Sequence, residues 1–270
     1  MMPQIDLDAY FRRIGWAEPV PPDLATLSRL LQAHMRAIPF ENLDVLMGRP
    51  IRLDLASLQQ KLIAERRGGY CFEHATLFAA LLAALGLEPA CHLARVLLHG
   101  PKERAAQSHM FVTLALPEGR YVFDPGFGGP ASRLPVRLAE GENQASHWFQ
   151  REGGDWVLRM RGEEGTRQLW GSTLAAAYPI DFEVASHYVA THPDSAFVTS
   201  LMMSRFTEEG SVSLRNRDAT LRRGEAVQRW QLADRAALQS FLAEHFDIAL
   251  TEQAILRLPA FPEGEERVTA

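Results

Sequence analysis

Apolar residues recur at helical spacing over the first third of the chain. In the segment LATLSRLLQAHMRAIPF, one apolar stripe predicts a helix that ends before Pro39, because proline cannot continue it. The stripe consists of Leu24, Leu27, Leu30, Leu31 and Met35. A second helix is predicted over LDLASLQQKLIAERRGG, with Asp54 at its start and two glycines at its end. A third is predicted to start near Cys71 and to stop at Gly86.

Beyond Pro89 the pattern changes to short apolar runs bounded by Gly, Pro or Asp, which is typical of strands. These runs are CHLARVLL, HMFVTLAL, RYVFD, WVLRM and RQLW. From about Asp181 the pattern is mixed, and RAALQSFLAEHFDI is expected to form one late amphipathic helix. The chain is therefore expected to belong to the α+β class, with a helical part, a β part and a mixed C-terminal part.

Length, charge and cysteine content narrow the class of protein. A chain of 270 residues predicts two or three small subdomains that share one core. The formal charge of -5, without a basic stripe, argues against nucleic acid or an anionic membrane as a partner and favours a small molecule. The apolar run ATLFAALLAALGL is too short to span a bilayer. Two cysteines and a start without a basic, apolar leader favour a reduced cytoplasmic protein over a disulfide framework.

Cys71 occupies a position that favours reactivity. It follows Gly68, Gly69 and Tyr70 at the head of the third predicted helix, within RRGGYCFEH. The unpaired N–H groups and positive dipole end of a helix N-terminus favour a thiolate, and the glycines allow backbone N–H groups to approach a developing oxyanion. The alternative is a small buried apolar residue, which is the common role of a free cysteine. Cys91 lies within a predicted strand and is expected to be structural.

A nucleophilic thiol needs a base, and the base needs a group that orients it. Among nine histidines, His109 starts a predicted hairpin whose second strand ends at Asp124. With a three-residue loop at Pro117-Glu118-Gly119 and Leu116 opposite Arg120, Asp124 faces away from His109. A one-residue bulge at the glycine would bring it to the His109 face. A structural histidine and a turn aspartate remain the alternatives.

A metal site is the rival use of the same residue types. Cys71 and His74 form a C-x-x-H pair, and Cys91 and His92 are adjacent. No second pair with zinc-site spacing completes the set, so no metal is expected.

Five motifs, in unbroken order, resemble the arylamine N-acetyltransferase family. They are IPFENLDVL, RRGGYCFEH, SHMFVTL, FDPGFGG and THPDSAF. The resemblance implies a helical first domain over 1–88, a β-barrel over 89–195 and an α/β lid over 196–270, around a cysteine-protease-like core. It also implies Cys71 as the acetyl-carrying nucleophile, His109 as its partner and Asp124 as the orienting group.

The same resemblance implies acetyl-CoA as co-substrate and an arylamine or arylhydrazine as the acceptor, in a ping-pong mechanism. Phe40 and Phe127 would line the substrate cleft, and Gly128 and Gly129 would let CoA approach closely. It further implies an ion pair between Arg67 and Glu41.

The chain departs from the common family pattern at Ala75, where many members have Asn, and at Pro125, where many have Val. Some similar proteins form amide bonds with a carrier-bound acyl donor. An amide synthase is therefore one alternative, a cysteine hydrolase with the same triad is a second, and a binding module that has lost catalysis is a third.

Overall fold

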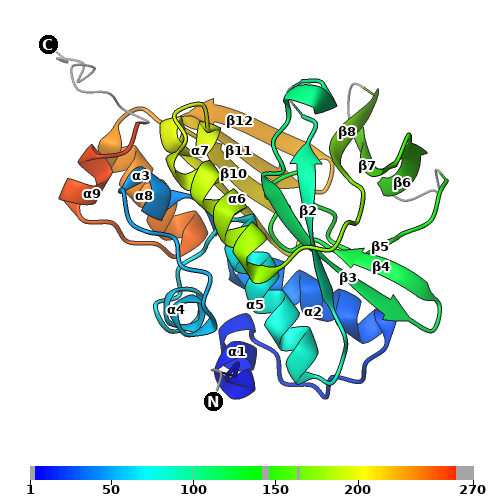
Figure 1. Cartoon of the computed structure of the whole chain (residues 1–270). Coiled ribbons are helices and arrows are strands. Elements are labelled where there is room, and N and C mark those ends of the chain that lie inside the picture. Colours follow the sequence, from blue (N-terminus) through cyan, green and yellow to red (C-terminus); the bar gives the residue numbers. More distant parts are fainter. Residues whose placement is uncertain (1–3, 99, 142–145, 163–164, 260–270) are drawn as a thin grey trace, which may run out of the picture.

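The computed structural model describes residues 4–98, 100–141, 146–162 and 165–259. The N-terminal part is helical (Figure 1), and all three predicted helices are present. The second is α-helical only over its first turn and then continues as a π-helix over Gln59–Ala64. The α-helices of this part are α1 (Leu7–Ile14), α2 (Leu24–Ala37), α3 (Leu43–Leu46), α4 (Leu55–Leu58) and α5 (Cys71–Ala84).

Aspartates start three of these helices. The side chains of Asp6, Asp23 and Asp54 each accept a hydrogen bond from the backbone N–H three residues later, at the N-termini of α1, α2 and α4. The apolar faces of the helices then pack together and onto the sheet that follows, and the ring of Phe78 on α5 stacks on that of Phe123. The predicted apolar stripes therefore form one core with the β part.

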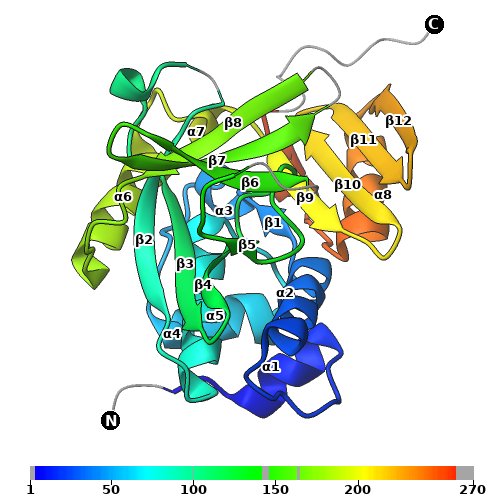
Figure 2. The same ribbon diagram turned by 90° about the vertical axis from the view of Figure 1, so that its right-hand side faces the viewer.

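A seven-stranded antiparallel sheet follows, in the order β5-β4-β3-β2-β8-β7-β6. Its outer strands approach each other, since Gly141 donates to the carbonyl of Phe149 on β6, so the sheet is a nearly closed barrel (Figure 2). A 3-10 turn, Lys102–Arg104, lies between β2 and β3. The strands are β2 (Ala90–Val96), β3 (His109–Leu116), β4 (Gly119–Phe123), β5 (Val136–Arg137), β6 (His147–Glu152), β7 (Asp155–Gly162) and β8 (Gly165–Ser172).

The register of the β3–β4 hairpin differs from the one predicted with a three-residue loop. Leu116 pairs with Gly119 rather than with Arg120, so the loop holds only two residues. Gly119 makes this possible because its φ of 137° is open to glycine and strained for other residues. The last pair is Val112 with Phe123, which leaves Asp124 level with Phe111 and therefore on the His109 face.

The C-terminal part is a five-stranded sheet in the order β1-β9-β10-β11-β12, and α8 packs in its core. Its first strand comes from the N-terminal part, so this sheet is joined to the region that carries Cys71. Two helices, α6 (Pro179–Thr191) and α7 (Ala196–Thr199), connect the barrel to it. The remaining elements are β1 (Phe40–Glu41), β9 (Met202–Phe206), β10 (Gly210–Arg215), β11 (Asp218–Arg223), β12 (Ala226–Gln231), α8 (Arg235–Phe246) and α9 (Glu252–Leu256).

The expected α+β class is confirmed: a helical N-terminal part, a central barrel and a C-terminal α/β part follow one another along the chain. Within the described ranges, no helix combines the length and the apolar character needed to cross a membrane.

Candidate active site

Cys71 is the first residue of α5. The start of the helix is fixed by a reciprocal pair, in which the Tyr70 N–H donates to the Glu73 carboxylate and the Glu73 N–H donates to the Tyr70 carbonyl. The thiol is 3% exposed, and its sulfur lies 3.8 Å from the carbonyl oxygen of Ser108. The cysteine therefore lies at the positive end of a helix dipole, as predicted.

Glycines let two backbone segments approach this helix start. A Cβ placed on Gly126 would lie 2.7 Å from the Cα of Cys71 and 3.0 Å from the Cβ of His74. A Cβ on Gly68 would overlap the Pro39 carbonyl oxygen. Only glycine fits at these two positions, so the loop after β4 packs directly against the turn that carries the thiol.

The structure brings His109 and Asp124 together through the two-residue loop of the hairpin, without the bulge that we considered from the sequence. The His109 Nε2 lies 2.9 Å from Oδ2 of Asp124, and both side chains are buried, at 2% and 5% exposure. The indole N–H of Trp170 donates to the same carboxylate oxygen at 3.0 Å. Sequence patterns gave no signal for Trp170, because β8 reaches Asp124 only through the closure of the barrel.

The electrostatics favour a charged imidazole. Burial alone would lower the pKa of His109, but the charge of Asp124, the hydrogen bond to it and a hydrogen bond to Cys71 together raise that pKa to about 10. At neutral pH His109 is therefore an imidazolium next to the thiol. This is the protonation state that supports a thiolate nucleophile.

Aromatic rings surround the triad. The ring of Phe127 meets His109 edge-on at 4.8 Å between centroids, and a Cβ on Gly128 would lie 3.4 Å from the Phe40 ring. A Cβ placed on Gly129 would meet nothing within 4 Å. Phe197 packs against both Phe40 and Tyr70, at 6.0 and 5.6 Å. Sequence reasoning gave Phe197 no role, although it lies in THPDSAF.

A cluster of buried charges supports the turn before Cys71. Arg67 bonds to Glu41 at 2.7 Å, so the ion pair implied by the resemblance is present, and it also contacts Asp44 at 3.2 Å. Lys61 lies 2.7 Å from both Asp44 and Glu73. Burial raises the pKa of Glu73 to about 7 although Lys61 opposes this. The cluster ties the π-helical turn, β1 and α5 together.

A chain of buried hydrogen bonds runs behind α5. Nε2 of His74 lies 3.1 Å from the carbonyl of Pro39, its Nδ1 lies 2.8 Å from Nε2 of His34, and Nδ1 of His34 lies 2.7 Å from the Tyr10 hydroxyl. The carbonyl only accepts, so His74 donates to it, His34 donates to His74, and Tyr10 donates to His34. The direction of every bond is thereby fixed, with both imidazoles neutral.

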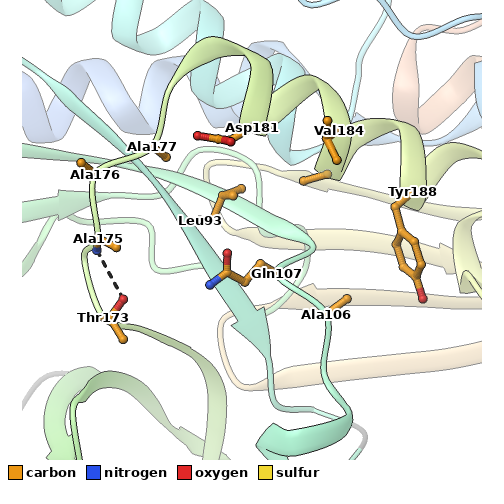
Figure 3. A pocket seen from close by; sticks show the side chains of 11 residues that line it. Leu93, Ala106, Gln107, Thr173, Ala175, Ala176, Ala177, Asp181, Val184 and Tyr188 are labelled. Carbon is orange, nitrogen blue, oxygen red and sulfur yellow. Dashed lines mark hydrogen bonds between the residues drawn. The ribbon is translucent and has the colours of Figure 1, made fainter.

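A cavity of about 540 Å³ opens between β2, the segment before His109 and α6 (Figure 3). Alanines, Leu93 and Tyr188 form most of its wall, with Gln107, Thr173 and Asp181 as polar members. Gln107 precedes Ser108, whose carbonyl contacts the Cys71 sulfur, so this part of the wall is next in the chain to a neighbour of the thiol.

The remaining sequence candidates lie outside this constellation. Cys91 is on β2, and burial raises the pKa of its thiol to about 11, which fits a structural residue. Within the part of the chain that the structure describes, no three His, Cys, Asp or Glu side chains come together as metal ligands would.

A buried thiol at a helix N-terminus, an adjacent imidazolium and a carboxylate that holds the imidazolium define a class: enzymes that transfer or hydrolyse acyl groups through a cysteine. Comparison with known proteins narrows the class. The family model described as N-acetyltransferase matches residues 23–255. The chain belongs to the arylamine N-acetyltransferase family.

Relatives match the chain over nearly its whole length. It is 37% identical over 261 residues to the arylamine N-acetyltransferase of Mycolicibacterium smegmatis, covering 93% of this chain and 94% of the relative. It is 33% identical over 252 residues to that of Escherichia coli, covering 91% and 90%.

Solved structures agree. The M. tuberculosis arylamine N-acetyltransferase superposes with a TM-score of 0.88 at 35% identity, covering 93% of this chain and 99% of that one. The Mycobacterium marinum enzyme in complex with CoA superposes with a TM-score of 0.85 at 34% identity, covering 90% and 93%.

Proposed function

We propose that the chain is an acetyl-CoA-dependent arylamine N-acetyltransferase that carries the acetyl group as a thioester on Cys71. The observation that carries the proposal is that His109 bonds to the Cys71 thiol on one side and lies 2.9 Å from the Asp124 carboxylate on the other. The names of the relatives, and the CoA bound to the M. marinum enzyme, support the donor and the acceptor class. The partners are thus small molecules: acetyl-CoA and an arylamine or arylhydrazine.

In the first half-reaction, the thiolate of Cys71 attacks the carbonyl carbon of acetyl-CoA. The carbon–sulfur bond to CoA breaks as the new thioester forms, and the departing CoA thiolate takes the proton of His109. The negative oxygen of the intermediate faces the backbone N–H groups at the start of α5, where the helix dipole favours negative charge. His109 is then neutral and ready to accept a proton.

In the second half-reaction, the acceptor nitrogen attacks the acetyl carbon. The bond to the Cys71 sulfur breaks, the amide forms, and the proton lost by the amine passes to His109. This restores the ion pair of the resting enzyme. Water competes with the amine at this stage, and the rings of Phe40, Phe127 and Phe197 exclude it from the thioester.

The proposal assigns roles to the three parts of the chain. Residues 1–88 supply the thiol, residues 89–195 supply the imidazole and carboxylate, and residues 196–270, of which 260–270 lie outside the described residues, supply a lid that contributes to the cleft. Separate core clusters for the barrel and the C-terminal sheet support this division. Gly128 and Gly129 let the pantetheine arm of acetyl-CoA approach closely, and the open space next to Gly129, where an added Cβ would meet nothing within 4 Å, supports this role.

Steady-state kinetics test this function. Acetyl-CoA and the amine use one site in turn, so double-reciprocal plots at several fixed amine concentrations should be parallel. Intersecting lines would support direct transfer within a ternary complex instead. A cysteine hydrolase would release acetate rapidly without any amine, and an amide synthase would accept another acyl donor better than acetyl-CoA. The lifetime of the acetyl-enzyme in the absence of amine therefore distinguishes a hydrolase from a transferase.

A further inference from the structure

Trp170 makes a polar contact that the reaction as described above does not use. Its indole N–H donates to Oδ2 of Asp124 at 3.0 Å, and the same oxygen accepts from Nε2 of His109 at 2.9 Å. The second carboxylate oxygen, Oδ1, is buried and has no hydrogen-bond partner among the described residues. Two donors therefore hold one oxygen, and Trp170 is one of them.

The strand that carries Trp170 is built to aim it inward. The pairing of β7 with β8 shifts by one residue, so that Leu158 faces Trp170 while Arg159 faces Gln168. Leu169 is the extra residue, and both it and Trp170 are fully buried although neighbours in a strand normally point to opposite faces. The bulge thus turns the indole into the barrel, toward β4.

Neighbouring rings fix the plane of the indole. The ring of Phe111 stacks on it with centroids 4.3 Å apart. The ring of Phe149 meets it edge-on, with centroids 5.5 Å apart and an angle of 63° between the ring planes. A tryptophan side chain has only two torsions, and both are constrained by this packing. The N–H is therefore a rigid donor held at one point in space.

A rigid donor has a defined effect on this carboxylate. An ionised Asp124 at 5% exposure depends on its hydrogen bonds for stability, because little water reaches it. The indole donates but cannot accept, so it favours the ionised carboxylate and leaves the proton on His109. It also prevents the carboxylate from rotating to present its unpartnered oxygen to the imidazole.

We propose that Trp170 is a positioning residue: its indole N–H holds the Asp124 carboxylate in the orientation in which the same oxygen bonds to His109 beside Cys71. This inference rests on the proposed function of the triad. It concerns a side chain that does not touch the substrate and acts only through the carboxylate.

The direct test is Trp170→Phe, which keeps an aromatic ring in the barrel and removes the donor. Loss of a hydrogen bond to a charged group changes an equilibrium constant by a factor of about ten to a hundred. We therefore expect kcat/KM to fall by about ten- to a hundredfold. The pH profile of Cys71 labelling by iodoacetamide should shift to higher pH by about one unit, because the imidazolium partner is less stable. Labelling needs no acetyl transfer, so it reports on the ion pair alone.

Trp148→Phe is the matched control. Trp148 is also a buried barrel tryptophan, at 4% exposure, and lies on β6 rather than beside Asp124. It should leave kcat/KM and the labelling profile as in the native protein. Circular dichroism and urea unfolding of both variants establish that the comparison is between folded proteins.

The indole signal gives a second readout in chains that retain Trp170. In a ¹⁵N-labelled protein, its side-chain N–H resonance is assigned by its loss in Trp170→Phe. In Asp124→Asn this resonance should move, because the acceptor is no longer charged, while that of Trp148 should stay. The shift itself is measured in a chain that keeps Trp170, and Trp170→Phe serves only to assign the resonance.

The outcomes separate this proposal from the proposed function. An unchanged labelling profile in a folded Trp170→Phe protein, or an indole resonance that stays in place in Asp124→Asn, would overturn the role of Trp170. If Cys71→Ala were inactive in the same assays, the acetyl-transfer function would still stand. If Cys71→Ala retained full turnover, the function itself would fail, whatever Trp170 does.

Discussion

Acidification should destabilise the fold through the buried histidine pair. Burial, the neighbouring His74 and Arg13 hold the pKa of His34 well below its usual value. Burial lowers the pKa of His74 to about 4, although its hydrogen bond to the Pro39 carbonyl opposes this. Both side chains must stay neutral for the directed chain from Tyr10 to Pro39 to persist, whereas both are free to charge in the unfolded protein.

The sign follows from the protons bound by each state. Below about pH 6.5, the pKa of an unfolded histidine, each of the two histidines binds a proton in the unfolded state but not in the folded state. The free energy of unfolding therefore falls as pH falls. Glu73 acts in the opposite direction: burial raises its folded pKa to about 7, so the native state holds a proton that the unfolded state releases above about 4.3.

The net difference is one proton, since two histidines oppose one glutamate. One proton corresponds to about 1.4 kcal/mol per pH unit, and because the unfolded histidines are only half protonated at about pH 6.5, the loss between about pH 6.5 and 5 is about 1 kcal/mol. The lowered pKa values of His92 and His147, both caused mainly by burial, steepen this loss.

Urea unfolding over a series of pH values measures this slope, and His34→Phe tests its origin. The variant should be less stable at neutral pH by about 1 to 3 kcal/mol, because Tyr10 and His74 each lose a buried partner. Its slope below about pH 6.5 should be flatter by about one proton. His187→Gln, at an exposed position on α6, should keep the native slope. If His34→Phe also kept the native slope, the assignment of the acid sensitivity to this chain of hydrogen bonds would be wrong.

Three substitutions, two of them with a matched control variant, probe the triad and the packing around it. Cys71→Ala should abolish turnover, whereas Cys91→Ala should retain activity and lose only some stability, as amine acetylation and thermal unfolding would show. Asp124→Asn should slow iodoacetamide labelling of Cys71 and shift it to higher pH while circular dichroism stays native; an unchanged profile would make Asp124 a turn residue. Gly126→Ala should lower both Tm and activity, because its Cβ would lie 2.7 Å from the Cα of Cys71. Gly129→Ala should affect Tm little, because its Cβ would meet nothing within 4 Å. An equal change in Tm for the two variants would contradict the role of close packing.

Much of this fold follows from local patterns in the sequence. Helix α2 obeys apolar periodicity, α2 and α4 begin at aspartate caps, and the long strand β3 is bounded by turn residues at its end. The order of Cys71, His109 and Asp124, each at the start or end of an expected element, made a triad possible, and the resemblance of five motifs to a known family implied their roles. These features depend on neighbours in the chain.

The features that were missed depend on contacts between distant segments. β1 has only two residues and exists because it pairs with β9, and β6, with the sequence HWFQRE, lacks a clear alternation. The register of the β3–β4 hairpin depends on the positive φ of Gly119. Glycine can adopt this angle but need not, so the residue type alone does not predict the register. The contact of Trp170 with Asp124 depends on the β-bulge in β8 and on closure of the barrel. Neither feature can be predicted from the sequence of one strand.

The most direct test of the central claim is mass spectrometry of the intact protein after brief exposure to acetyl-CoA, followed by peptide mapping. The account predicts a gain of one acetyl group, located on Cys71, that disappears when an arylamine is added and reappears as the acetylated amine. The Cys71→Ala protein should gain none. An acetyl group on another residue, or a Cys71 thioester that an arylamine does not discharge, would contradict the account.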